Sequence, residues 1–465
     1  MQKLSFIFLI TLLICFQNSF AQQPKKPTAV DIYSQIQKLN FLGSVLYIAA
    51  HPDDENTRLI SYMANHQKAR TGYLSLTRGD GGQNLIGTEL RELLGVIRTQ
   101  ELIEARKIDG GEQFFSRAND FGYSKIPNET LKVWNKDQVL SDMVYVIRNF
   151  QPDVIITRFD HRSPGTTHGH HTSSAMLSQE AFDIAIDKNT YPSQLELVQP
   201  WQPKRLLFNT SYWFYGGKDK FDKADKSALV NLPTGVYYQS LGKSNQEIAA
   251  LSRSRHQSQG FGSTGSRGDD IEYMELIKGN APKEKNNLFE GIDTSWNRIK
   301  GGNAVGTVLQ NVEKNFDFRN PSASIAELVK AYSMIQKLED EHWKAVKSKE
   351  IKEIIASCAG LYLEAVAENQ EATPGSSIKL RLEAINRSDV KIDLTSVKVF
   401  PEGKAFPQNK ALNKNSDENR EIDITFPQNT PYKNLPRKGH LDECVPVFLI
   451  LFLDILLLKF EAELL

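Results

Sequence analysis

The residues best suited to chemistry form a short acidic run, AHPDDE, at positions 50–55. It follows a continuous apolar run at residues 45–50, which predicts a buried strand, and it precedes a helical pattern. One imidazole and three carboxylates can supply two metal ligands and still leave a free base. The simpler alternative is a helix N-terminus, where acidic side chains cap unpaired amide groups and complement the helix dipole.

A second cluster is rich in histidine. His168, His170 and His171 stand within four residues, out of nine histidines in the chain. The cluster follows a predicted strand at residues 154–159 and opens a predicted helix. Because ligands in open α/β sheets bind outside the carboxyl ends of the strands, both clusters are expected at one edge of the sheet. The alternative for the histidines is a solvated surface turn.

Taken together, the two clusters predict one mixed nitrogen and oxygen metal site. Two imidazoles and a carboxylate suit Zn²⁺ and leave a coordination position open for water. Bound zinc lowers the pKa of that water towards about 7, which makes hydroxide available at neutral pH. Beyond Cys15 the chain has only Cys358 and Cys444, which have no metal-like spacing, so any metal must use His and carboxylate ligands.

The elements that must position these residues alternate along the first half of the chain. Strands are predicted at residues 45–50, 72–77, 113–116, 154–159 and 205–214, and helices at 57–67, 88–108, 139–150, 171–186 and 244–259. Such alternation predicts an α/β fold, with a Rossmann-like, mostly parallel sheet and helices on both faces. The loop at residues 78–84 lacks the spacings of phosphate-binding loops and is interpreted as a turn lining the metal pocket.

A helical region and a β module follow. Residues 281–366 are predicted to be mostly helical, most clearly at 325–338 and 350–367. From Ile378 the apolar pattern changes to period two, which predicts a small β-sandwich-like module over residues 367–434.

The apolar tail at residues 435–465 leaves too few strands for a complete sandwich. Its most apolar run is short for a membrane span and contains Asp454, so no stable span is expected. A truncated or frame-altered terminus is favoured over a membrane anchor.

Residues 1–21 are predicted to be a cleaved signal peptide. Lys3 supplies the positive charge, an apolar stretch follows, and Ser19-Phe20-Ala21 is a small-x-small cleavage site. A periplasmic or secreted location is therefore expected. The 56 basic residues balance the 56 acidic ones, so the net charge favours neither nucleic acid nor an anionic membrane as partner.

The AHPDDE run and the later His-x-x-His at positions 168–171 resemble the PIG-L/LmbE-like family of zinc N-deacetylases. The resemblance extends over roughly residues 40 to 280 and predicts a deacetylase domain at residues 22–280. The family acts on N-acetylated sugars and related amides. Arg98 and Glu101 also match the family. So does the run His256–Gln259, which is similar to the family's His-x-Ser-Gln.

Residue by residue, the resemblance implies a division of roles. His51, Asp54 and His171 would bind the metal. Asp53 would be the general base, and His168 would assist the transition state. Arg98 would contact the substrate, although a helix-surface ion pair is an equal alternative.

One departure concerns the residues between the two motif histidines. The family often has Pro-Asp there, whereas this chain has Gly169 and His170. The usual Asp, which supports the metal ligands from outside the coordination sphere, is therefore missing. His170 is a competing candidate for the third ligand.

The resemblance implies a zinc-dependent hydrolase that removes an N-acetyl or other N-acyl group from an amino sugar or glycan, and the predicted signal peptide implies that it is exported. One alternative is an amidase acting on a larger sugar-linked conjugate. Another is an inactive glycan-binding protein, which predicts a disrupted ligand set or a missing base. All of the motif's ligand and base positions are filled here. The sequence specifies neither the exact substrate nor the oligomeric state.

Overall fold

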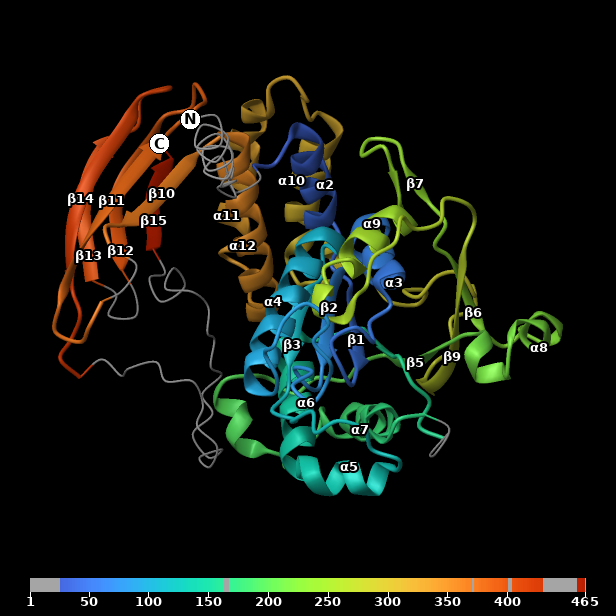
Figure 1. Ribbon diagram of the computed structural model, residues 1–465. Helices are drawn as coiled ribbons and strands as arrows, with labels where there is room; N and C mark the ends of the chain where they lie inside the picture. The colour runs from blue at the N-terminus through green and yellow to red at the C-terminus, as the bar shows by residue number, and fades with distance from the viewer. Residues whose placement is uncertain (1–25, 163–166, 370–371, 400–403, 430–457, 465) are drawn as a thin grey trace, which may run out of the picture.

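The computed structural model describes residues 26–162, 167–369, 372–399 and 404–429, and the backbone of 458–464. The signal peptide predicted at residues 1–21 and most of the tail at 435–465 lie outside the described residues. Figure 1 shows three parts side by side: an α/β layer, a layer of helices and a β module.

The α/β layer is built on a seven-stranded sheet with the order β3-β2-β1-β4-β5-β9-β6. The strands from β3 to β5 in this order run parallel, whereas β9 pairs antiparallel with both β5 and β6. The prediction of a mostly parallel α/β sheet is thus confirmed. The strands are β1 (Ser44–Ala49), β2 (Arg70–Ser75), β3 (Glu112–Phe115), β4 (Val154–Thr157), β5 (Arg205–Thr210), β6 (Val230–Pro233) and β9 (Ile271–Gly279).

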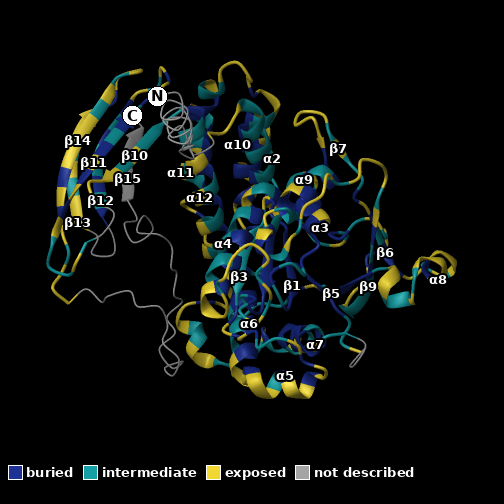
Figure 2. Cartoon of the chain, viewed as in Figure 1, coloured by how far each residue is buried: buried dark blue, intermediate teal, exposed yellow. Residues whose placement is uncertain are grey.

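Helices cover both faces of this sheet, which is why β1 is apolar throughout. Val45 and Tyr47 belong to the core on one face, and Leu46 and Ile48 to the core on the other. One face carries α3 (Thr57–Ser61), which continues as a π-helical turn (Tyr62–His66), together with α4 (Glu92–Asp109) and α9 (Asn245–Arg253). The other carries α5 (Pro127–Trp134), α6 (Lys136–Phe150) and α7 (Gly169–Ile184). Figure 2 shows the central strands buried between them.

Shorter elements connect the layer. They are α8 (Lys218–Lys223), the hairpin of β7 (Tyr237–Tyr238) and β8 (Lys243–Ser244), and the 3-10 turns Pro192–Glu196, Tyr212–Tyr215 and Gln257–Gln259. A capping box begins α9: the Ser244 side chain accepts from the Glu247 amide, and the Glu247 side chain accepts from the Ser244 amide. This helix ends at Arg253 rather than at 259.

Two further predicted helices were wrong in their bounds. The helix predicted at 88–108 begins only at Glu92, because Arg91 has φ 55°, a left-handed conformation that interrupts a right-handed helix. Leu90 and Leu93, which lie within the predicted helix, are 61% and 46% exposed. The helix predicted at 350–367 is also wrong: α12 (Glu341–Cys358) ends before Gly360, at φ 56°, and β10 (Tyr362–Ala367) follows.

The helical layer consists of α10 (Gly302–Lys314), α11 (Ile325–Ile335) and α12, joined by the N-terminal α2 (Ala29–Leu39) and the 3-10 turns Trp296–Arg298 and Pro321–Ser324. These helices share one core, to which Ile392 and Leu394 of the β module also belong. Although α2 precedes the sheet in sequence, it therefore packs with helices that follow the α/β layer.

A buried ion pair joins this layer to the sheet. The Asp153 carboxylate accepts from the Ser44 amide and from both Nη atoms of Arg298, each at 3.0 Å, and its side chain is fully buried. We expect Asp153→Ala to lower the free energy of unfolding by about 3–5 kcal/mol, because Arg298 loses its counter-charge in a buried place. Removing Asp222, whose ion pair with Lys218 is exposed, should lower the free energy of unfolding by less than about 1 kcal/mol. Urea denaturation measures both free energies of unfolding, and equal decreases in the two variants would contradict this account.

The β module contains two three-stranded sheets. One has the order β10-β11-β14 and the other β13-β12-β15. The strands are β11 (Ser377–Ile385), β12 (Ile392–Val399), β13 (Lys404–Ala411), β14 (Asp417–Thr425) and β15 (Leu458–Leu464). β11, β12 and β14 contribute to a single apolar core, so the two sheets face one another.

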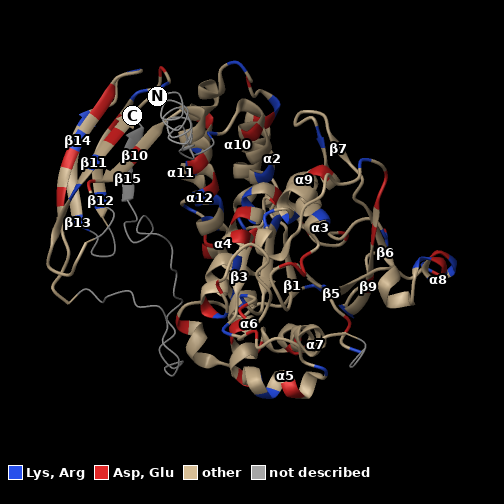
Figure 3. Cartoon of the chain, viewed as in Figure 1, with Lys and Arg blue, Asp and Glu red and all other residues tan. Residues whose placement is uncertain are grey.

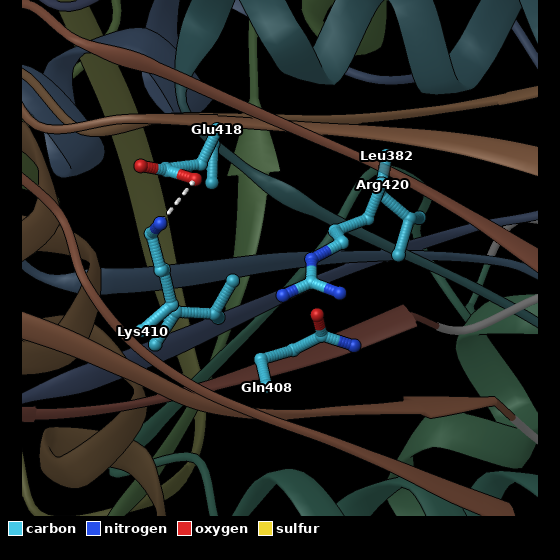
Figure 4. A pocket seen from close by; sticks show the side chains of 7 residues that line it. Leu382, Gln408, Lys410, Glu418 and Arg420 are labelled. Carbon is cyan, nitrogen blue, oxygen red and sulfur yellow. Dashed lines mark ion pairs between the residues drawn. The ribbon is translucent and has the colours of Figure 1, made fainter.

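Polar side chains line a small cavity in this module (Figure 4), among them Gln408, Arg420 and the ion pair of Lys410 with Glu418 at 3.4 Å. Its volume of about 10 Å³ is at most enough for one water molecule, so it is not a ligand site.

Charges of both signs are interspersed on α8, α12 and β14 (Figure 3), in keeping with the balanced composition. None of the helices in the described ranges combines the length and the apolar character that crossing a bilayer requires.

Candidate metal centre

The acidic run forms a tight turn at the carboxyl end of β1. Asp54 Oδ2 accepts from the backbone amide of His51 at 2.8 Å, and Tyr73 of β2 donates its hydroxyl to the His51 carbonyl at 2.6 Å. Asn56, rather than an acidic residue of the run, caps α3 by accepting from the Leu59 amide. The carboxylates of the run are therefore not used as caps of this helix.

Three side chains meet at this turn. His51 Nδ1 lies 3.1 Å from Asp54 Oδ2, and His171 Nε2 lies 3.5 Å from Asp54 Oδ1. Ligand atoms at about 2.0–2.2 Å from a tetrahedral zinc ion lie about 3.3–3.6 Å from one another. The His171–Asp54 distance lies in this range and the His51–Asp54 distance is slightly shorter. The potential ligand atoms of His51, Asp54 and His171 all lie within 4.8 Å of one another, so this group could hold a metal ion. The ring of His171 is held by stacking on Phe159, with 3.8 Å between ring centroids.

The protonation states of His171 and Asp54 also suit a cation, whereas at His51 burial is outweighed by the charge and hydrogen bond of Asp54, which raise the pKa of its imidazole. Burial lowers the pKa of His171 to about 4, so its imidazole is neutral at pH 7. Burial opposes ionisation of Asp54, but the charges of His171 and His51 together hold the pKa of its carboxyl well below the usual range. A neutral imidazole and an ionised carboxylate are the forms that bind metal.

His170 lies on the side of the His51 ring that faces away from Asp54. It is fully buried between the rings of Phe121 and Trp134, at centroid distances of 4.5 and 4.8 Å, and burial lowers its pKa to about 2. Its Nδ1 lies 2.9 Å from Nε2 of His51, the ring nitrogen that does not face Asp54. His170 thus contacts a candidate ligand in the way that outer-shell partners orient metal-bound histidines. A second group, His51, His168 and His170, is also close enough for a metal but contains no carboxylate.

Asp53 stands apart from the ligand groups and is more exposed than Asp54, with 26% of its side chain accessible against 12%. Burial and then the charge of Asp54 raise the pKa of Asp53 to about 7. A base whose pKa is near the working pH is effective in proton transfer. The two adjacent aspartates thus have distinct environments: Asp54 lies beside the imidazoles and Asp53 lies beside Arg98.

Arg98 is not a helix-surface residue. Only 5% of it is exposed, its Nη2 lies 3.5 Å from Asp53 Oδ2, and its Nη1 donates to the Gly79 carbonyl at 3.0 Å. A Cβ atom added at Gly79 or Gly82 would come within 2.3 Å of Arg98 Nη1. The glycines of the 78–84 loop therefore allow this loop to wrap around the guanidinium.

A cavity of about 480 Å³ adjoins the same loop, a size typical of ligand pockets. Its lining includes Asp80, Gly82, Glu92 and Asp120. Asp120 Oδ1 lies 3.9 Å from His170 Nδ1, which places this wall of the cavity next to the histidine cluster.

His168 is the N-cap residue of α7. Its Nδ1 lies 3.1 Å from the His170 nitrogen and its Nε2 lies 3.3 Å from the Ser124 nitrogen, so a backbone N–H faces each ring nitrogen as a donor. Burial lowers the pKa of His168, so the ring is neutral at pH 7. Because a neutral imidazole accepts at only one nitrogen, only one of these two amides can be hydrogen-bonded to the ring in either tautomer, and the other ring nitrogen carries the proton. The rings of His168 and His171 are 5.2 Å apart.

Sequence reasoning missed a buried network behind the turn. Glu55 pairs with His256 at 2.6 Å and with Arg106 at 3.3 Å, and Glu101 accepts from both the amide and the hydroxyl of Ser258. These residues stood in or near the recognised motifs, but their pairing joins α4 to a segment more than 150 positions away. No local pattern could have shown it.

The chain is similar in sequence to known deacetylases. The family model described as PIG-L, GlcNAc-PI de-N-acetylase, matches residues 46–182. A protein of Kineococcus radiotolerans, named 1D-myo-inositol 2-acetamido-2-deoxy-alpha-D-glucopyranoside deacetylase, is 27% identical over 208 residues. The match covers 37% of this chain and 56% of that protein, so the chain spans about half the length of this relative.

Two solved structures are similar at a lower level. The N,N'-diacetylchitobiose deacetylase of Pyrococcus horikoshii is 17% identical, with a TM-score of 0.34, over 49% of this chain and 83% of its own. The 4-carboxy-2-hydroxymuconate hydratase of Pseudomonas putida is 16% identical, with a TM-score of 0.35, over 53% of this chain and 99% of its own.

Proposed function

We propose that this chain is a zinc-dependent hydrolase that removes an N-acetyl group from an amino sugar or glycan, on the basis of the site and of the match of residues 46–182 to the PIG-L family model. The observation that carries the proposal is the meeting of His51, Asp54 and His171, with Asp53 beside them but outside the ligand set. The name of the Kineococcus relative, a deacetylase of a 2-acetamido sugar, supports the substrate class.

Each residue of the site has a separate role in the proposed reaction. A zinc ion held by His51, Asp54 and His171 would supply Lewis acidity and an activated water. Asp53 takes the proton from the attacking water, for which its raised pKa suits it. His168 donates a ring N–H to the oxygen on which negative charge develops. The proton then passes from Asp53 or His168 to the leaving nitrogen, which yields acetate and a free amine.

The alternatives differ in what they require. An inactive glycan-binding protein needs no base, yet Asp53 is present with its pKa raised to about 7 and remains accessible to a substrate. An amidase acting on a larger sugar-linked conjugate would use the same centre and differ only in the acyl group released.

The test is to measure metal content and acetate release on the same preparation. We expect about one zinc per chain and acetate release from N-acetylglucosamine or its oligomers, lost on dialysis against a chelator and restored by Zn²⁺. Metal without acetate release, but with cleavage of a larger amide conjugate, would favour the amidase. Metal with glycan binding and no cleavage of any amide would favour the binding protein.

We also propose that the chain is exported, on the strength of the signal-peptide pattern in residues 1–21. Expression in a bacterial host, with N-terminal sequencing of the periplasmic fraction, should give a mature chain beginning at Gln22. An uncleaved chain confined to the cytoplasm would contradict export without affecting the proposed reaction.

A further inference from the structure

We propose that Arg253 and Glu55 are positioning residues, which hold the backbone of Asp53 in a left-handed conformation and thereby aim its carboxylate. This inference rests on the proposed function, in which Asp53 is the base. It concerns residues outside the ligand set and a segment, the end of α9, that is 200 positions from Asp53 in the sequence.

The starting observation is the backbone of Asp53, which has φ 99°. Residues other than glycine rarely adopt positive φ, and such strain persists only where surrounding contacts enforce it. Strained residues of this kind cluster at functional sites. Asp53 therefore needs an external restraint, and a restraint at the candidate base has consequences for catalysis.

Contacts on both sides of the residue supply this restraint. Glu55 Oε2 accepts from the Asp53 amide at 2.9 Å, and Arg253 Nη1 donates to the Asp53 carbonyl at 2.8 Å. Rotation of Asp53 to negative φ would move its amide relative to its carbonyl and so disrupt at least one of these bonds. The side chain, meanwhile, points to Arg98 at 3.5 Å.

Both restraining side chains are themselves fixed. The second oxygen of Glu55 is bound by His256 at 2.6 Å, and both side chains are fully buried. The Arg253 guanidinium carbon lies 4.1 Å from the centroid of the Phe261 ring. The base is thus tied to the last turn of α9 and to the segment that follows it.

The experiment compares Arg253→Met with Arg253→Lys, because Arg253 is only partly buried and its loss is less disruptive than that of Glu55. We expect Arg253→Met to lower kcat about 10- to 100-fold, since small misplacements of catalytic groups have effects of this size. KM and the zinc affinity measured by chelator competition should change less than about two-fold. The melting temperature should change by no more than a few degrees. Arg253→Lys, which can still donate to the carbonyl, should recover part of kcat.

The matched control is Arg255→Met, which removes an exposed arginine two positions away and should leave kcat unchanged. An unchanged kcat in Arg253→Met would overturn the inference. So would a loss of kcat that is matched by loss of zinc affinity or of thermal stability, because a general structural role would then explain it.

Failure of the proposed function is distinguishable from failure of this inference. If the wild-type protein cleaves no amide, crystal structures of the wild type and of Arg253→Met still test the restraint. We expect Asp53 to keep positive φ in the wild type and to leave it in the variant. Retention of positive φ without the Arg253 guanidinium would overturn the inference, whatever the reaction.

Discussion

Replacing Asp53 with Asn should lower kcat by about 10²- to 10⁴-fold and leave zinc bound, because the change removes a general base without removing a ligand. Asp53 is absent from both groups of side chains that are close enough to hold a metal, and its nearest charged partner is Arg98. The measurement is kcat for acetate release, with metal content determined on the same sample.

Asp389→Asn is the matched control, because Asp389 lies on the exposed surface of the β module, where it pairs with Lys414. This variant should keep both its activity and its metal. If Asp53→Asn lost the metal while Asp54→Asn kept it, the roles assigned to the two aspartates would be reversed.

Zinc affinity should fall by more than about 100-fold in His171→Ala, and activity should fall with it. His171 Nε2 faces Asp54 across the space for the cation, so its loss removes a ligand. In His170→Ala the loss should be smaller, about 10- to 100-fold, because His170 contacts only the far ring nitrogen of His51 and acts as an outer-shell partner.

The two variants decide which histidine is the third ligand. Chelator competition gives both affinities, and circular dichroism verifies that each variant is folded, which matters most for the fully buried His170. A larger loss of affinity in His170→Ala than in His171→Ala would mean that the metal lies in the all-histidine group.

The order of strands and helices around the site was predictable because local patterns specify it. β1 is buried on both faces and therefore consists of consecutive apolar residues, which is visible in the sequence. The capping box at Ser244 is likewise local, since its partners are three residues apart. Where a backbone conformation interrupts an otherwise regular pattern, as at Arg91 and Gly360, the pattern extended the helix too far.

By itself, the sequence determined which residues could do the chemistry and at which edge of a parallel sheet they would lie. It did so because motif spacing and hydrophobic periodicity are properties of adjacent residues. Only the tertiary structure decided that His171 faces Asp54 while His170 turns to the far side of His51, and that Asp53 is held at positive φ. The histidine orientations depend on packing against Phe159, Phe121 and Trp134, and the conformation of Asp53 depends on contacts such as that with Arg253 of α9. These side chains approach the turn only after the chain has packed, and no short-range pattern encodes such contacts.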